Sequence, residues 1–254
     1  MNFKIPKLRV NYPHKINALK YLLRNPSLAL GLFRDSSKLY FSRTIENVLG
    51  LNIIYCLHNL LPEKFANHLK ENQIGDHNGL RLMLYSIVRK YKPEIVVETG
   101  VSRGASSAFI LCAMRENGKG HLYSIDLPSD NAPAIKEEGR NILGDGARYS
   151  VAQKPVGHLV PEYLKDRWTL ILRDAKIELP ALLKKTGEIS IFFHDSLHTY
   201  EHMLFEYETA WPYISKGGLL LSHDVLWNEA FLKFSKKVKS KPAIYYSFGV
   251  IKKT

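Results

Sequence analysis

The feature that most constrains this chain is a short β-branched run that ends in a glycine turn. An apolar pattern with helical spacing follows the turn. Residues 94–104 have the sequence EIVVETGVSRG, and ASSAFILCAM follows directly. A strand, a tight loop and a helix N-terminus in this order form the first unit of a nucleotide-binding α/β sheet. The pattern therefore predicts a strand over 94–100 and a helix over 105–116.

The loop and the next strand narrow the kind of ligand. Gly100 and Gly104 let the backbone approach a ligand closely, but no third glycine is present for a pyrophosphate. Glu98 lies just before the loop, and Asp126 ends a second strand, HLYSIDLP. A carboxylate in that place can accept hydrogen bonds from both hydroxyls of a ribose. We infer a nucleoside ligand without a diphosphate, and S-adenosylmethionine fits this description.

Strand and helix patterns alternate from about residue 76 onward, and the strands are nearly continuous apolar runs. This alternation predicts an α/β fold with a Rossmann-like, mostly parallel sheet covered by helices on both faces. The expected strands cover 94–100, 121–127, 168–174, 188–195, 218–225 and 243–252, and the expected helices cover 79–91, 105–116, 176–185, 199–213 and 226–238.

Two regions stand apart from this alternation. Residues 1–75 are basic, mainly helical in pattern and interrupted by prolines, which predicts an N-terminal extension packed on a main domain over 76–254. Residues 129–167 are long and rich in glycine and proline. A connection of that length inside a compact domain predicts a lid or substrate loop.

Composition places the chain among ordinary globular proteins, with 45% apolar and 24% charged residues. The sequence holds no run of about 18 apolar residues and no apolar segment after the basic start, so neither a membrane span nor a secretory signal is expected. Cys56 and Cys112 lie inside apolar helical patterns and are expected to be buried thiols. We expect a cytoplasmic protein.

The net charge of +12 is concentrated in residues 1–45 and in a lysine cluster near the C-terminus. One interpretation is two solvated basic faces. The other is attraction to an acidic partner, such as a phosphorylated substrate, an anionic lipid surface or RNA. No specific nucleic-acid motif supports the RNA version.

Five motifs in order resemble the class I S-adenosylmethionine-dependent methyltransferases. More narrowly, residues 79–254 resemble the subgroup that contains sugar and small-molecule O-methyltransferases and cephalosporin-hydroxylase-like proteins. The resemblance implies a seven-stranded sheet whose last strand is antiparallel. It is carried by ETGVSRGASS (98–107), LYSIDLP (122–128), VGHLVPEYLKDRWTLILRDA (156–175), the segment 192–225 and the closing strand.

The resemblance also implies cofactor-binding roles for six residues. Glu98, Gly100 and Gly104 match the loop that holds the methionine part of the cofactor, and Ser106 would cap the helix or contact the cofactor. Asp126 matches the acid on the ribose. Asp174 matches the residue that contacts adenine, although the family commonly has glycine where Arg173 stands. The alternative for Asp126 and Asp174 is a helix-cap or loop acid.

The candidate reaction site lies at the end of the fourth strand, where His194-Asp195-Ser196-Leu197-His198 follows. Ligands bind at strand C-termini in open α/β sheets, so these residues are expected beside the methyl group of the cofactor. In metal-dependent members of the family, a D-x-x-H motif here supplies a metal ligand and a general base. Asp195 and His198 match it, and the resemblance implies that both are catalytic, with His198 as the base. A helix-start histidine bonded to nearby backbone is the alternative.

A divalent cation is expected to be weakly bound or absent, with Asp195 and Asp224 as the ligands if one is present. His223 stands where the family generally has an acid, and an imidazole favours softer transition metals over Mg²⁺. Adjacent strand residues point to opposite faces, so His223 either joins the site or turns outward and leaves it to Asp224.

The predicted function is S-adenosylmethionine-dependent methyl transfer to the oxygen of a small hydroxylated acceptor. Two alternatives remain open. One is a non-catalytic cofactor-binding or partner protein with the same fold. The other is an iron oxygenase with a triad of two histidines and one carboxylate, drawn from His194, His198, His223 and an aspartate. The sequence identifies neither the acceptor nor the oligomeric state, and it leaves a homo-oligomer open.

Overall fold

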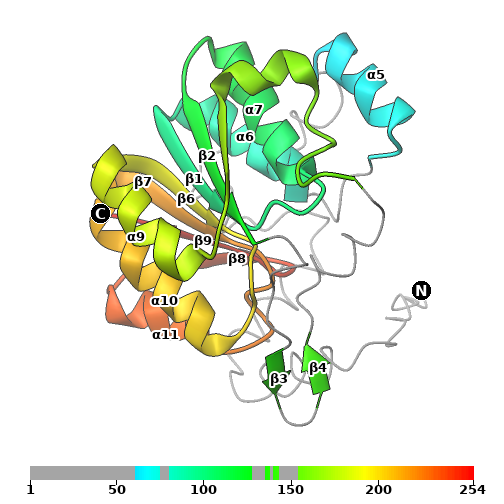
Figure 1. The fold of residues 1–254 in the computed structure, drawn as a ribbon. Helices are drawn as coiled ribbons and strands as arrows, with labels where there is room; N and C mark the ends of the chain where they lie inside the picture. Colours follow the sequence, from blue (N-terminus) through cyan, green and yellow to red (C-terminus); the bar gives the residue numbers. More distant parts are fainter. Residues whose placement is uncertain (1–60, 75–79, 128–134, 138–139, 143–153) are drawn as a thin grey trace, which may run out of the picture.

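A single seven-stranded sheet organises the chain, flanked by helices on both faces (Figure 1). The computed structural model describes residues 61–74, 80–127, 135–137, 140–142 and 154–254. The strands are β1 (Ile95–Thr99), β2 (His121–Asp126), β5 (Trp168–Leu172), β6 (Ile189–His194), β7 (Ile214–Ser222), β8 (Ala243–Tyr245) and β9 (Phe248–Lys252). The expected fold, a Rossmann-like sheet of seven strands, is confirmed.

The strand order is β5-β2-β1-β6-β7-β9-β8. The first five of these are parallel to one another, whereas β9 is antiparallel to both β7 and β8. The chain moves outward from β1 to β2 and β5, and then returns to place β6 on the other side of β1. The order in which the chain adds strands therefore reverses between β1 and β6. In open α/β sheets, ligands bind at such a point, beyond the carboxyl ends of the strands.

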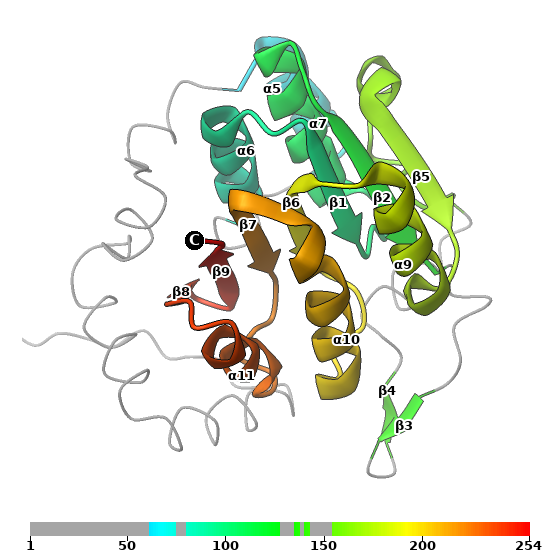
Figure 2. The same cartoon turned by 90° about the vertical axis from the view of Figure 1, so that its left-hand side faces the viewer.

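Two hydrophobic cores lie on the two faces of the sheet, and side chains of one strand alternate between them. Ile191 and Phe193 of β6 belong to the core that α5, α6 and α7 share, and Phe192 belongs to the core under α9, α10 and α11 (Figure 2). Because side chains alternate between two covered faces, residues 191–193 of β6 are all apolar. The helices are α5 (Glu63–Glu71), α6 (Leu80–Tyr91), α7 (Ala105–Asn117), α9 (Ala175–Thr186), α10 (Tyr200–Ala210) and α11 (Ala230–Lys237).

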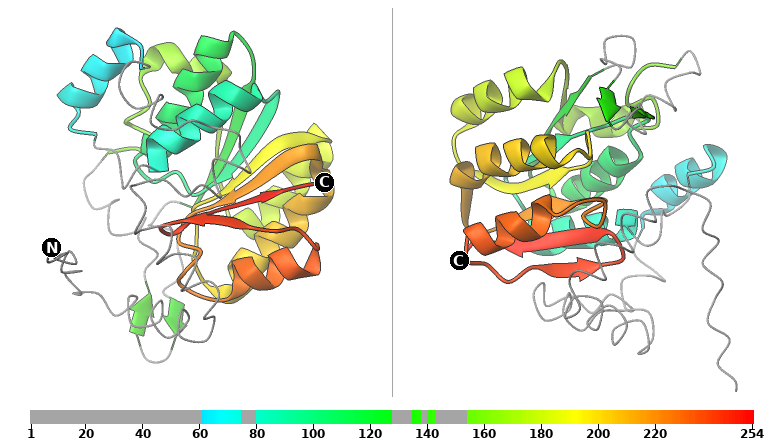
Figure 3. Two further views of the ribbon diagram at one scale, coloured as in Figure 1. Left: turned by 180° about the vertical axis from the view of Figure 1, so that it is seen from behind. Right: turned by 90° about the horizontal axis from the view of Figure 1, so that it is seen from below.

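The closing segment differs from the single strand expected over 243–252. It forms an antiparallel hairpin of β8 and β9 at the edge of the sheet (Figure 3). Tyr245 pairs with Phe248, which leaves Tyr246 and Ser247 as the turn, and Tyr246 has a φ of +52°. The turn was not predicted because Tyr246-Ser247 is not one of the Asn-Gly or Asp-Gly pairs that usually form a two-residue hairpin turn.

The region before β1 is described only in part. Residues 1–60, which make up most of the expected extension and include Cys56, lie outside the described residues. Helix α5 is described, and its Phe65 is 1% exposed, with its ring edge-on to Phe109 of α7 at 5.2 Å. Helix α5 therefore packs on the main domain. The boundary at residue 75 stays a prediction.

The long segment between β2 and β5 also has described parts. Two short strands, β3 (Ile135–Glu137) and β4 (Arg140–Ile142), pair with each other, and a 3-10 helix, η2 (Glu162–Arg167), leads into β5. The remainder of 128–153 lies outside the described residues. Its expected role as a lid or substrate loop stays a prediction.

Candidate active site

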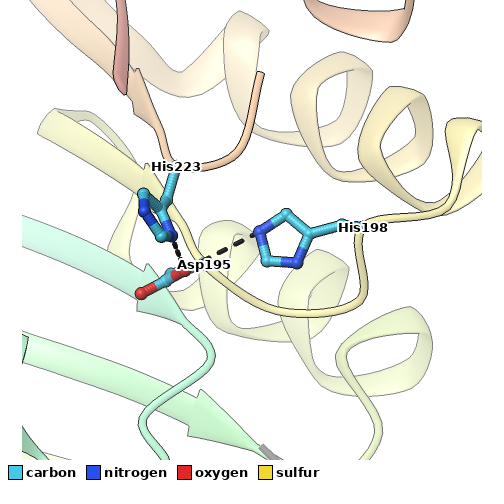
Figure 4. Close-up of side chains that lie close together, drawn as sticks. All are labelled: Asp195, His198 and His223. Carbon is cyan, nitrogen blue, oxygen red and sulfur yellow. Dashed lines mark hydrogen bonds and ion pairs between the residues drawn. The ribbon is translucent and has the colours of Figure 1, made fainter. Parts of the chain in front are cut away.

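Three polar side chains from distant parts of the sequence meet just beyond the ends of two neighbouring strands. Asp195 follows β6, His223 follows β7, and His198 lies in the turn before α10. Oδ1 of Asp195 lies 2.8 Å from Nδ1 of His223 and 3.7 Å from Nε2 of His198 (Figure 4). We call these three residues the Asp–His–His group. They lie at the edge of the sheet where ligands of this fold bind.

The register of β6 and β7 explains why Asp195 and His223 meet. The strands are parallel with His194 opposite Ser222, and the N–H of His223 donates to the carbonyl of His194 over 2.9 Å. Asp195 and His223 are the next residue on each strand, so both project to the same side of the sheet. Of the two alternatives for His223, the structure shows the one in which it joins the site.

Asp224 lies next to this group and has its own contacts. Its Oδ1 accepts a hydrogen bond from Ser247 over 3.0 Å and lies 3.6 Å from Nε2 of His223. Its φ of +49° shows that the regular alternation of the strand has ended. Asp224 adjoins the Asp–His–His group through His223, and its role as a metal ligand stays a prediction.

Asp195 and His223 form a partly buried ion pair. Burial alone would lower the pKa of His223, but the carboxylate of Asp195 outweighs it and raises that pKa to about 9. Burial would likewise raise the pKa of Asp195, but the charge and hydrogen bond of His223 hold it below its usual range. An imidazolium therefore donates its Nδ1–H to a carboxylate at neutral pH.

His198 has the opposite electrostatic character. Burial, followed by the neighbouring His194, lowers the pKa of His198 to about 3, so the ring is neutral at physiological pH. Its Nε2 is buried without a hydrogen-bond partner, and its ring packs 5.0 Å from that of Trp227. A neutral imidazole with an unused nitrogen can accept a proton or bind a cation.

The glycine loop after β1 lies directly against the Asp–His–His group. Gly100 has a φ of +85°, and a Cβ added there would collide with the backbone carbonyl of Asp195. Gly104 has a φ of +88° and begins α7, and its added Cβ would lie 2.7 Å from Cα of Gly157. Only glycine meets both demands, a left-handed backbone and a close approach of two chain segments.

Glu98 is fully buried behind this loop. Its Oε2 accepts hydrogen bonds from Ser107 of α7 over 2.6 Å and from Ser124 of β2 over 2.7 Å, and its Oε1 is buried without a partner. Burial raises the pKa of Glu98 to about 8, although both serine hydrogen bonds lower it. Glu98 thus links β1, which leads into the glycine loop, to α7 and β2. One of its two carboxyl oxygens has no hydrogen-bond partner.

Asp126 holds the glycine loop from the end of β2. Its Oδ2 accepts the backbone N–H of Val101 over 3.1 Å and that of Ser102 over 2.6 Å. Ser106 lies partly buried in the first turn of α7. The sequence placed both residues at the cofactor, and the structure places both beside the loop.

Asp174 caps helix α9, because its Oδ1 accepts the N–H of Lys176 over 2.8 Å. This is the cap that the sequence analysis left as its alternative. Asp174 also follows the end of β5, on the far side of β2 from the loop. A capping role and an adenine contact are compatible, and the second stays a prediction.

The sequence did not single out a fully buried acid, Glu206 of α10. The carboxylate of Glu206 is 0% exposed. It accepts hydrogen bonds from Thr99, His194, Ser196 and His202. One signal was present, since Glu206 lies three residues after the buried Met203 and four before the buried Ala210, on the inward face of the helix.

The comparison with known families decides the identity. The profile of a family described as a methyltransferase domain matches residues 97–225, about half of the chain. The chain belongs to this family. It is a class I S-adenosylmethionine-dependent methyltransferase, as its motifs predicted. The matched span begins in β1 and ends just after the Asp–His–His group.

Solved structures share the fold of the methyltransferase at low sequence identity. SAH-bound methyltransferase PaMTH1 of Podospora anserina superposes with a TM-score of 0.54 at 16% identity, covering 79% of this chain and 92% of that one. The calicheamicin methyltransferase CalS11 gives 0.53 at 16%, covering 83% and 91%. A putative caffeoyl-CoA O-methyltransferase from Staphylococcus aureus gives 0.52 at 13%, covering 80% and 99%. No curated protein sequence matches the chain.

The Asp–His–His group of the methyltransferase has the donor atoms of a metal site. One ligand atom from each residue lies within 4.8 Å of the others. Two imidazole nitrogens and one carboxylate oxygen suit borderline and softer divalent cations better than they suit Mg²⁺. The buried, unpaired Nε2 of His198 is the atom for which a cation would provide a partner.

None of the described helices of the methyltransferase combines the length and the apolar character that a membrane crossing requires.

Proposed function

We propose that the methyltransferase transfers the methyl group of S-adenosylmethionine to a hydroxyl oxygen of a small acceptor at the Asp–His–His group. The observation that carries this proposal is the close approach of Gly100, in the glycine loop after β1, to the backbone of Asp195. The loop that would hold the methionine part of the cofactor thus directly adjoins the candidate acid–base residues.

The cofactor would be held by the residues around the glycine loop. Gly100 and Gly104 let the loop adopt its left-handed turns and pack closely against the backbone of Asp195 and Gly157. The unpaired Oε1 of Glu98 would accept a hydrogen bond from the ammonium group of the methionine part once that cation lowers the pKa of the carboxyl from about 8. Asp126 would bind the ribose hydroxyls while it holds the loop. Ser106 and Asp174 complete the proposed set, at the start of α7 and beside the adenine.

Methyl transfer to an alcohol forms a bond between oxygen and carbon and breaks the bond between sulfur and carbon. The hydroxyl proton must leave, because an alcohol is a poor nucleophile until it is deprotonated. Nε2 of His198 is the proposed acceptor of that proton, since it is neutral and has no hydrogen-bond partner. Its pKa of about 3 makes it a weak base at neutral pH, so it would take the proton as the hydroxyl attacks the methyl group rather than before. Asp195 would stabilise the resulting imidazolium from 3.7 Å.

A divalent cation bound by Asp195, His198 and His223 would supply a second way to activate the acceptor, by lowering the pKa of a bound hydroxyl. If Nδ1 of His223 is the ligand atom, the cation would displace the proton that His223 donates to Asp195. His198 could serve as a ligand or as a base, but one nitrogen cannot do both at once. We therefore propose that a cation, if bound, leaves base function to another group or to the acceptor's own lowered pKa.

The cofactor assignment can be tested by calorimetric titration with S-adenosylhomocysteine. Wild-type protein is expected to bind it, and Asp126→Ala is expected to weaken binding. Asp166→Ala, which changes an exposed acid of η2, is the matched control and should bind normally. Absence of binding at millimolar ligand, or equal binding by Asp126→Ala, would overturn the assignment.

The acceptor and the base can be tested together. A mass-spectrometric screen of hydroxylated compounds with labelled cofactor would identify the acceptor, and His198→Ala would then be assayed on it. We expect turnover to fall by about 10²-fold or more while cofactor affinity is retained. Wild-type turnover by His198→Ala would show that another group is the base.

A further inference from the structure

The carboxylate of Glu206 gathers four hydrogen bonds from four different places in the fold. Oε2 accepts from Thr99 Oγ1 and from His194 Nδ1, each over 2.6 Å. Oε1 accepts from Ser196 Oγ and from His202 Nε2, each over 2.9 Å. A carboxylate offers about four acceptor positions, so all of them are used.

The two donors nearest the candidate site flank Asp195 in the sequence. His194 precedes Asp195, and Ser196 follows it. Both side chains donate hydrogen bonds to Glu206 on the face of the sheet that α10 covers. Successive residues of an extended chain point to opposite sides. Because both neighbours of Asp195 are held on the α10 side, Asp195 itself is directed to the other side, toward His223 and His198.

Glu206 also reaches the cofactor loop through Thr99, the last residue of β1. The carbonyl of Thr99 accepts the backbone N–H of Asp195 over 2.8 Å, and Gly100 follows directly. One buried carboxylate thus holds the start of the cofactor loop and both neighbours of Asp195 at the same time.

We propose that Glu206 is a positioning residue that directs Asp195 into the site and fixes it against the cofactor loop. This inference rests on the proposed function only in treating Asp195 as part of the reaction site. Glu206 touches neither cofactor nor acceptor and acts through Thr99, His194 and Ser196. Burial raises the pKa of this carboxyl, but the electrostatic interaction with His194 and the hydrogen bonds from His194 and His202 outweigh burial. They hold the pKa of Glu206 below its usual range, so its carboxylate remains charged.

The contacts to Oε1 provide a matched pair of variants. Ser196→Ala and His202→Phe each remove one donor to the same oxygen at the same distance, 2.9 Å. Ser196 adjoins Asp195, whereas His202 lies one turn away from Glu206 on α10 itself. A merely structural role predicts similar effects from both, and a positioning role predicts an effect from Ser196→Ala only.

Glu206→Gln tests the carboxylate directly, because the amide replaces one accepting oxygen with a donor. With an acceptor from the screen, we expect Glu206→Gln and Ser196→Ala to lower kcat about tenfold to a hundredfold, since small misplacements of reacting groups are costly. The Kd for S-adenosylhomocysteine should stay within about threefold of wild type, since the Asp126 contacts with the loop remain. His202→Phe should keep the wild-type kcat.

A second readout needs neither cofactor nor acceptor. In protein labelled with ¹⁵N-histidine, the Nδ1–H of His223 that is donated to Asp195 gives its own resonance. We expect Glu206→Gln to shift or broaden this resonance and His202→Phe to leave it in place. An unchanged resonance in Glu206→Gln, or equal losses of kcat in Ser196→Ala and His202→Phe, would overturn the proposal.

The two proposals fail in different ways. If wild-type protein does not bind S-adenosylhomocysteine, the proposed function fails, while the resonance of His223 still reports whether Glu206 directs Asp195. If Glu206→Gln does not fold, the comparison of Ser196→Ala with His202→Phe decides the question alone.

Discussion

Nδ1 of His223 and Oδ1 of Asp195 lie 2.8 Å apart, in a pair that joins the ends of β6 and β7. The pair is an ion pair, because the pKa of His223 is raised to about 9 and that of Asp195 is held below its usual range. A cation bound through Oδ1 of Asp195 and Nδ1 of His223 would therefore have to displace the proton between them.

Replacing His223 with aspartate should change which metal the site prefers. His223→Asp exchanges an imidazole for a carboxylate and gives two acids beside each other, which favours hard cations. We expect Mg²⁺ affinity to rise by about tenfold or more and Zn²⁺ affinity to fall. Calorimetric titration of wild type and variant with each metal measures both changes. Tighter Mg²⁺ binding by the wild type than by the variant would contradict this account.

Glu98 should make the stability of the methyltransferase depend on pH. Burial raises its pKa in the folded protein from about 4.5 to about 8. A group whose folded pKa is raised contributes stability that is fully present below pH 4.5 and is lost as the pH rises through 8. Glu98→Gln mimics the protonated form at every pH. We expect the variant to match wild type near pH 4.5 and to exceed it in urea unfolding above pH 8.

Ser107→Ala is a control for the Glu98 experiment. It removes one of the two hydrogen bonds to Oε2 but keeps the titrating carboxyl. Its unfolding free energy should therefore fall with rising pH at least as steeply as that of wild type. Parallel pH profiles for Glu98→Gln and wild type would show that Glu98 does not titrate in this range.

Gly100→Ala should both destabilise the fold and abolish cofactor binding. The added Cβ would collide with the backbone of Asp195 at a residue whose φ is +85°. We expect a loss of about 2 to 4 kcal/mol from strain and overpacking together. Gly118→Ala, with a φ of +70° and no atom within 4 Å of the added Cβ, measures the backbone strain alone. It should cost about 1 kcal/mol and leave binding of S-adenosylhomocysteine unchanged.

Phe65→Ala should show whether α5 is an integral part of the domain. The ring of Phe65 is 1% exposed and lies against Phe109. Its removal is expected to cost about 3 to 5 kcal/mol in denaturant unfolding, with a single transition. Glu71→Ala, at the exposed end of the same helix, should cost less than about 0.5 kcal/mol. A change below 1 kcal/mol for Phe65→Ala, roughly, would indicate that α5 unfolds separately.

The glycine loop, the strand ends and most element boundaries follow from local patterns. Predicted strands over 94–100, 121–127 and 188–195 correspond to β1, β2 and β6 within two residues at each end. The helix expected over 226–238 begins later, at Ala230, because the side chain of Asn228 accepts the N–H of Ala230 and shapes a turn before it. Such turns depend on a single side-chain contact, which periodicity does not report.

Taken alone, the sequence determined the fold class, the family and the placement of Asp195, His198 and His223 near one sheet edge, because hydrophobic periods and loop glycines are local signals. Only the tertiary structure decided that His223 faces Asp195, since this depends on the pairing of His194 with Ser222 across two strands. It also decided the role of Glu206, whose four partners come from β1, β6, the following loop and α10. Strand register and buried networks arise from packing between segments distant in the chain, and no local pattern encodes them.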